Sequence, residues 1–157
     1  MKALRIALVA FAALLLAACS SGPVRRVSEP AARIQQLTVN ADGSWSVDLR
    51  LENYSSMPMR FERVELKLEV GGHAAGTLQA APALDIGPES ADVVNVRLAP
   101  GAEAKIAAAD ALAARRSLPY RLEGRIDATP EDRDTRDFDV ATRSALNPAP
   151  GLPGVLR

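Results

Sequence analysis

The sequence contains very little of the chemistry that catalysis and metal binding require. Its 157 residues include one cysteine, Cys19, and one histidine, His73. A single cysteine excludes an internal disulfide and a metal site built from several thiolates. A serine hydrolase triad would need His73, which follows two glycines in a predicted turn, a poor platform for a general base. We therefore expect a protein that is not an enzyme and that has no cofactor and no metal site.

The sequence also lacks an excess of charge of either sign. Nineteen Lys and Arg residues balance 19 Asp and Glu residues, which gives a formal net charge of +0. A domain that binds nucleic acid usually carries a clear basic excess or a basic stripe. The composition therefore predicts no nucleic-acid partner.

An apolar run long enough to span a membrane is absent as well. The N-terminal stretch from Ile6 to Leu16 is about half of the roughly 20 residues that a spanning helix needs. Basic residues precede this stretch, and Leu16, Ala17, Ala18 and Cys19 end it. A basic start, a short apolar run and small residues are typical of a secretory signal peptide.

The four residues from Leu16 to Cys19 resemble the lipobox of bacterial lipoproteins. In that family the cysteine thiol takes up a diacylglyceryl group, and the chain is cleaved before the cysteine. The resemblance implies a signal peptide over residues 1–18 and a lipid anchor at Cys19, which makes the membrane a partner. Ser20, where an aspartate would imply retention in the inner membrane, implies an outer-membrane protein facing the periplasm. A plain secretory signal and a short uncleaved anchor stay open as alternatives.

Composition divides the rest of the chain into three parts. Residues 19–32 include Gly22, Pro23 and Pro30 and show no apolar period, which predicts a flexible tether. Residues 33–143 are long enough for one domain with its own core. Prolines and glycines crowd residues 147–154, so we expect a disordered tail over residues 144–157.

Alternation of apolar and polar residues predicts that strands make up most of the domain. The apolar side chains of Trp45, Val47, Leu49 and Leu51 share one parity, so they would line the dry face of a strand, with Trp45 in the core. Residues 64–70, 94–98 and 120–128 alternate in the same way.

The strand near residue 60 contains a break in parity. Met59 and Phe61 have the opposite parity from Val64, which predicts a bulge or a change of strand near Glu62.

One alanine-rich segment, residues 100–116, is predicted to be a helix. Glu103 near its start and Arg115 and Arg116 at its end match the helix dipole. Its apolar residues at helical spacing, which we expect to lie against a sheet, are Ala102, Ile106, Ala109, Leu112 and Ala113. About seven strands, with this helix before the sixth, predict an all-β antiparallel sandwich, and a small closed barrel is the alternative.

Two further sets of residues are candidate sites. Acidic residues that could attract a hard cation are Asp127, Glu131, Asp132, Asp134, Asp137 and Asp139. Arg133 and Arg136 lie among them, so we expect a self-neutralising hairpin and no metal site. Asn53 ends a predicted strand, and its side chain is expected to fix the turn that leads to Pro58.

From Ile34 to Val140 the chain resembles the type 2 late embryogenesis abundant proteins and the related water stress and hypersensitive response domain. Stretches that carry the resemblance are residues 49–53 with Pro58, residues 64–72, Gly76, residues 84–90 and residues 120–124. Tyr54 and Ser55 depart from the Pro-Asn that often follows the asparagine in this family. The resemblance implies an Ig-like or fibronectin-like sandwich with one helix, an association with desiccation or envelope stress, and no catalytic signature.

Two hypotheses about function follow. The first is a lipid-anchored, non-enzymatic envelope protein that protects other envelope components by binding them. The alternative is a periplasm-facing lipid carrier, or a scaffold for an envelope protein partner, that uses a cleft beside the helix.

Overall fold

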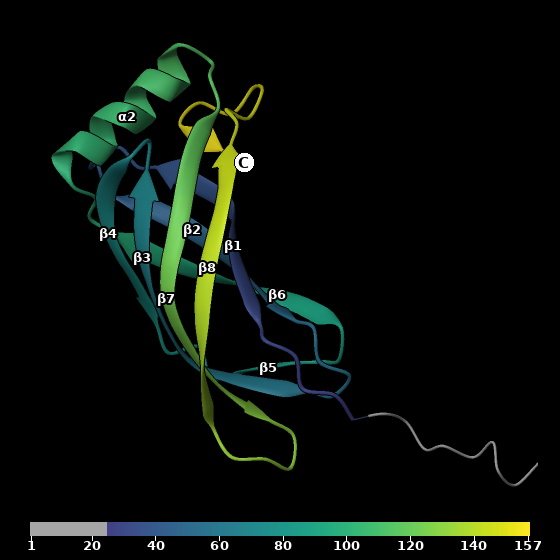
Figure 1. Ribbon diagram of the computed structural model, residues 1–157. Coiled ribbons are helices and arrows are strands. Elements are labelled where there is room, and N and C mark those ends of the chain that lie inside the picture. Colours follow the sequence, from purple (N-terminus) through teal and green to yellow (C-terminus); the bar gives the residue numbers. More distant parts are fainter. Residues whose placement is uncertain (1–24) are drawn as a thin grey trace, which may run out of the picture.

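The structure, a computed structural model, describes residues 25–157 and contains nine strands and one helix in that range. The strands are β1 (Ala31–Val39), β2 (Trp45–Asn53), β3 (Met59–Val70), β4 (His73–Ala80), β5 (Leu84–Ile86), β6 (Ser90–Leu98), β7 (Leu118–Pro130), β8 (Arg136–Leu146) and β9 (Val155–Leu156), and the helix is α2 (Ala102–Ala113) (Figure 1). The prediction of an all-β domain with one helix is confirmed. The count of about seven strands was too low, because three residues of β5 and two of β9 are too short to show alternation.

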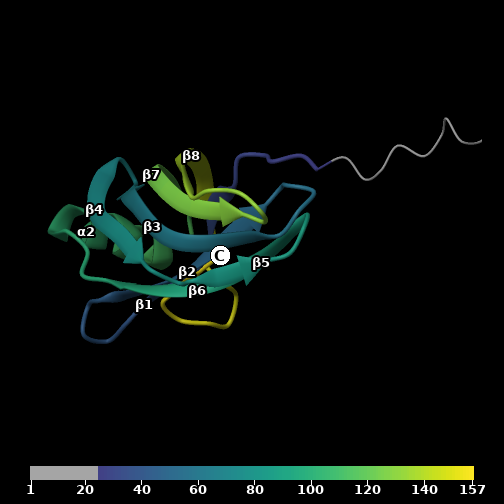
Figure 2. The same ribbon diagram turned by 90° about the horizontal axis from the view of Figure 1, so that it is seen from below.

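The strands form two sheets in which every pair is antiparallel. One sheet has the order β6-β2-β1-β9, and the other has the order β4-β3-β7-β8, with β5 also paired to β3. Figure 2 shows the two sheets as two layers, with α2 at one end. Because β7 occupies one edge of β3 along its length, β4 and β5 share the other edge.

A single core of apolar side chains fills the space between the two sheets. On β2, Trp45, Val47, Leu49 and Leu51 are buried, while the polar residues between them lie on the outer face. The assignment of Trp45 to the core is therefore confirmed.

A bulge in β3 near Glu62 allows apolar side chains on both sides of it to face the core. The pairing of β3 with β7 shifts register between Phe61 and Arg63, so that Phe61 and Val64 are both buried. The bulge predicted from the sequence is confirmed, because only an extra residue allows apolar side chains of opposite parity to face the same core.

The helix α2 lies in the predicted segment, but it buries a different face. Ala104, Ala108 and Ala111 are its buried residues, whereas Ile106 is 55% exposed. The prediction that the stripe containing Ile106 lies against a sheet was wrong. The helix lies close to the turn between β3 and β4, where a Cβ on Gly71 would be 2.9 Å from the Ala107 Cβ.

The C-terminal residues differ from the disordered tail expected over residues 144–157. β8 continues to Leu146, and β9 pairs with β1, which leaves Leu156 fully buried. Asn147 and Arg157 exchange two backbone hydrogen bonds, and Val39 donates one to the Gly154 carbonyl at 2.8 Å. Prolines exclude regular structure from the loop itself, but the apolar residues that follow it return the chain to the core.

Candidate functional site

The predicted lipidation motif lies outside the described residues. The described residues begin at residue 25, after Leu16, Ala17, Ala18 and Cys19. Within residues 25–157, no helix combines the length and the apolar composition that crossing a membrane requires.

The end of the expected tether is bound to the domain. The backbone N–H of Arg26 donates to Ser56 Oγ at 2.8 Å, and the N–H of Ser56 donates to the Arg26 carbonyl at 3.0 Å. Ser28 donates its N–H to Ser55 Oγ at 2.9 Å. Residues 25–30 are therefore held against the turn between β2 and β3, and β1 begins at Ala31, so the flexible tether expected over residues 19–32 was drawn too long.

The charges of Arg25 and Arg26 are matched by carboxylates of the domain. Arg25 bonds to Glu131 at 2.7 Å and to Asp132 at 3.1 Å, and Arg26 lies 4.0 Å from Glu89. These pairs are exposed, so each adds little to stability. They do fix where the N-terminal segment enters the domain, which is beside the turn between β7 and β8.

Asn53 is fully buried at the end of β2 and binds backbone groups on three sides. Its Nδ2 donates to the carbonyls of Met57 at 2.9 Å, Ile86 at 3.1 Å and Gly87 at 2.9 Å. Its Oδ1 accepts the N–H of Ser55 at 2.9 Å. Pro58 follows this turn, and its carbonyl accepts the N–H of Glu131 at 3.0 Å. The amide of Asn53 thus joins the turn after β2 to the end of β5.

A network of charged side chains surrounds Glu52 on the outer face of the same strand. The carboxylate accepts hydrogen bonds from Tyr54 Oη at 2.7 Å and Arg50 Nε at 3.1 Å, and it lies 2.7 Å from an Arg33 nitrogen. Burial raises the pKa of Glu52, but the Tyr54 and Arg50 bonds and the two arginine charges outweigh it and leave the pKa below its usual value. The hydrogen bond to Glu52 raises the pKa of Tyr54. This network keeps the carboxylate ionised, which is the wrong state for a general acid at neutral pH.

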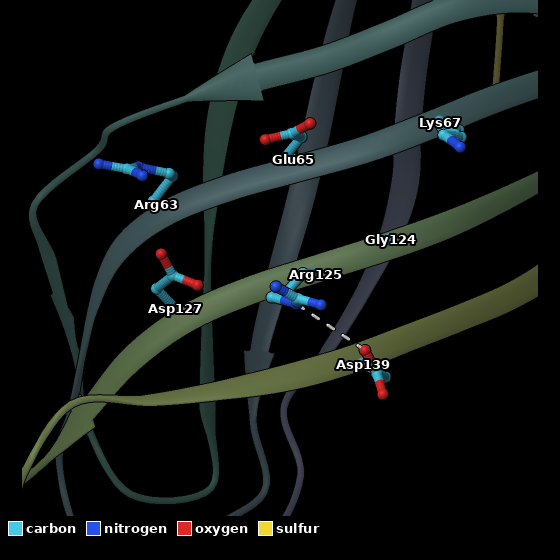
Figure 3. Close-up of a pocket in the computed structure, with 7 residues that line it drawn as sticks. All are labelled: Arg63, Glu65, Lys67, Gly124, Arg125, Asp127 and Asp139. Atoms are coloured by element: carbon cyan, nitrogen blue, oxygen red, sulfur yellow. Dashed lines mark ion pairs between the residues drawn. The ribbon is translucent and has the colours of Figure 1, made fainter.

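A shallow hollow of about 350 Å³ lies on the outer face of β3, β7 and β8 (Figure 3). Its lining residues are Arg63, Glu65, Lys67, Gly124, Arg125, Asp127 and Asp139. Acidic and basic side chains alternate across the strands, and Arg125 lies 4.0 Å from Asp139 and 3.7 Å from Asp137. Because the charges balance, the hollow has no strong preference for an anion or a cation.

The acidic residues between Asp127 and Asp139, which were considered as a cation site, pair with arginines other than those expected. Arg25 and Arg125, rather than Arg133 and Arg136, form the ion pairs with its carboxylates. The guanidinium of Arg136 instead lies 5.8 Å from the centre of the Phe138 ring. In the part of the chain that the structure describes, no group of three or more His, Cys, Asp or Glu side chains could hold a metal ion.

The feature best suited to binding is a groove between α2 and the C-terminal loop over residues 147–154, which we call the α2 groove. Its volume is about 910 Å³, and its helix side is formed by Ala109, Leu112, Ala113 and Arg115. Figure 1 shows α2 and this loop at the same end of the molecule. The alternative hypothesis from the sequence placed a cleft beside the helix, but it did not include this wall, because the prolines of the loop suggested disorder.

The comparisons with known proteins identify a family. The model of the late embryogenesis abundant protein family LEA_2 matches residues 48–143. A crystal structure of a protein from Archaeoglobus fulgidus is similar, with 13% identity and a TM-score of 0.46, over 79% of this chain and 98% of that chain. A solution structure of an Arabidopsis thaliana protein has 9% identity and a TM-score of 0.49, over 83% and 89% of the two chains. No curated protein matches significantly. Because the family match spans more than half of the residues of this chain, the chain belongs to the late embryogenesis abundant LEA_2 family.

Proposed function

We propose that this protein is a lipid-anchored, non-enzymatic component of the bacterial envelope whose LEA_2 domain acts by binding other envelope components. The observation that carries the proposal is the position of the α2 groove, at the end of the domain opposite the entry of the N-terminal segment (Figure 1).

The strand β7 supports this separation of the two ends. Its first residue, Leu118, pairs with Leu146 next to the groove, and its last residue, Pro130, precedes the turn that Arg25 contacts. A strand of 13 residues extends over about 40 Å. A lipid on Cys19 would therefore hold one end of the domain near the membrane, and the groove would face the periplasm.

Membership in LEA_2 supports a binding role, because this family is generally non-enzymatic. An association with envelope or desiccation stress is the corresponding physiological proposal. Ser20 after the cysteine supports placement in the outer membrane.

The anchor is tested by radiolabelled palmitate in cells that express the full chain. We expect label in the wild type and none in Cys19→Ala, because acylation needs the thiol. The matched control is Ser20→Ala, which keeps the thiol and should be labelled. Label in Cys19→Ala, or none in the wild type, would contradict the anchor.

A lipid carrier is the second candidate function, because the groove lies beside the helix and is lined mainly by apolar residues. Native mass spectrometry of the protein extracted from membranes tests it. A carrier would retain one noncovalent lipid, and this lipid should be lost when Ala113→Arg fills the groove. Absence of any such lipid would eliminate this candidate.

A further inference from the structure

We propose that the α2 groove binds an apolar segment of a partner protein that carries acidic side chains beside the apolar residues. This inference rests on the proposed binding function and specifies the chemistry of the partner.

The first argument is the apolar surface around the groove. Three large apolar side chains of the described residues are exposed, namely Tyr54, Ile106 and Leu152. Tyr54 uses its hydroxyl to bond Glu52 at the other end of the domain. Leu152 forms part of the loop wall of the groove, whereas Ile106 lies on α2 two turns before Ala113 and does not line it. An exposed leucine in the wall of a hollow lined mainly by apolar residues favours an apolar partner.

The second argument is charge. Among residues 25–157, Arg115 is the only ionisable residue that lines the groove, and Arg116 follows it directly. Neither has an ion-pair partner among residues 25–157, a property that they share with Arg63, Arg133, Arg136, Arg143 and Arg157. An acidic group on the partner would pair with Arg115 and give the interface complementary charges.

The third argument is that the groove wall is already ordered. Within the loop, Leu152 donates its N–H to Ala149 at 3.2 Å, and Val155 donates to Leu152 at 3.2 Å. The N–H of Ala149 donates to Val155 at 2.9 Å. A preformed wall lowers the entropy that binding must overcome.

Other occupants fit the groove less well. In a chain cleaved before Cys19, as proposed above, the six residues from Cys19 to Val24 reach about 20 Å when extended, which is half the length of β7 and too short to fill the groove from that side. Exposed Glu103 and Asp110 on α2 accompany exposed Lys105, Arg115 and Arg116, so the charges here have both signs and match placed charges on a protein better than a uniformly anionic lipid surface. A partner protein can place its charges to match.

Photocrosslinking in cells tests the occupant directly. We would place p-benzoylphenylalanine at Leu152 in the full chain, and at the exposed residue Ala141 of β8 as the control. The expected result is an adduct from position 152 alone, in which the crosslinked partner peptide has an apolar run next to Asp or Glu. A phospholipid adduct, a second copy of this chain, a partner peptide without acidic residues, or no adduct would overturn the proposal.

The charge requirement is tested with Arg115→Gly and Arg115→Lys in the same experiment. Arg115 has a φ of 51°, a conformation that glycine adopts without strain, so Arg115→Gly should fold at least as stably as the wild type. We expect the adduct yield to fall about fivefold in Arg115→Gly and to persist in Arg115→Lys. An unchanged yield in a folded Arg115→Gly would refute the role of the charge. Failure of palmitate labelling with adducts retained would reject the anchor and leave the groove proposal standing.

Discussion

Asn53 shows how one polar residue can hold the end of a β domain together. It is fully buried, and it shares its two Nδ2 hydrogens among the carbonyls of three residues. Each buried carbonyl left without a donor costs about 1–3 kcal/mol. We therefore expect Asn53→Ala to lower the free energy of unfolding by about 3 kcal/mol, measured by urea denaturation.

The matched control for Asn53 is Asn95→Ala. The Asn95 side chain is exposed and donates one hydrogen bond, to Asp48 at 2.7 Å. Its removal should change the free energy of unfolding by less than about 0.5 kcal/mol. Equal effects of the two substitutions would contradict the structural role assigned to Asn53.

Gly124 occupies a position in β7 where any side chain would meet backbone. A Cβ there would lie 2.2 Å from the Glu65 carbonyl oxygen, so β3 and β7 would have to separate. We expect Gly124→Ala to lower the free energy of unfolding by more than about 2 kcal/mol. Gly72→Ala is the control, because Gly72 has a φ of 85° but no heavy atom within 4 Å of the added Cβ. If thermal denaturation shows similar losses for both, the clash in β7 is not the cause.

Glu52 should make stability depend on pH in the acid range. Its pKa in the folded protein lies below the ordinary value of 4.5, so the unfolded chain takes up a proton first as pH falls. The stabilisation is complete above about pH 4.5 and is lost as pH falls through the lowered pKa. Asp42 acts in the same direction, because hydrogen bonds from Ser44 and the charge of Arg97 lower its pKa to about 2.

Glu52→Gln tests this account through the free energy of unfolding measured between pH 3 and pH 7. We expect the variant to be less stable at pH 7 and to lose less stability than the wild type as pH falls. Glu103→Gln, on the exposed side of α2, controls for the loss of one carboxylate. A Glu52→Gln variant with the same acid slope as the wild type would contradict the assignment.

At the scale of elements, the C-terminal segment is part of the core. Leu156 is fully buried and pairs with Leu37, whereas Leu152 in the preceding loop is 45% exposed. We expect Leu156→Ala to lower the free energy of unfolding by about 2–4 kcal/mol and Leu152→Ala to lower it by less than about 0.5 kcal/mol. A negligible effect of Leu156→Ala in chemical denaturation would restore the disordered tail that composition suggested.

The elements differ in how well they could be predicted, and the reasons are physical. The strands with one dry face were predictable, because burial on one side forces alternation such as that of Trp45 and Val47. The parity break at Glu62 was predictable for the same reason. The buried face of α2 was not predictable, because alanines occur on every side of the helix. Ile106, its largest side chain, was predicted to face the sheet but is 55% exposed.

At the scale of the whole molecule, the candidate site depends on contacts that no local pattern records. The α2 groove exists because β9 pairs with β1 and carries the loop over residues 147–154 back beside the helix. The N-terminal segment adheres to the opposite end through Ser55 and Ser56, which have no sequence signal for that role. The two ends of the domain are therefore set by long-range pairing.

The central claim is that a lipid-anchored domain keeps one end near the membrane and turns the α2 groove away from it. Energy transfer from a fluorophore on the protein to acceptor-labelled lipids in reconstituted vesicles tests this claim most directly. The fluorophore would be attached to a cysteine introduced at Asp132 or at Ala113, because acylation consumes the only native thiol. We predict strong transfer from position 132 and weak transfer from position 113. Equal transfer from the two positions, or stronger transfer from position 113, would contradict the account.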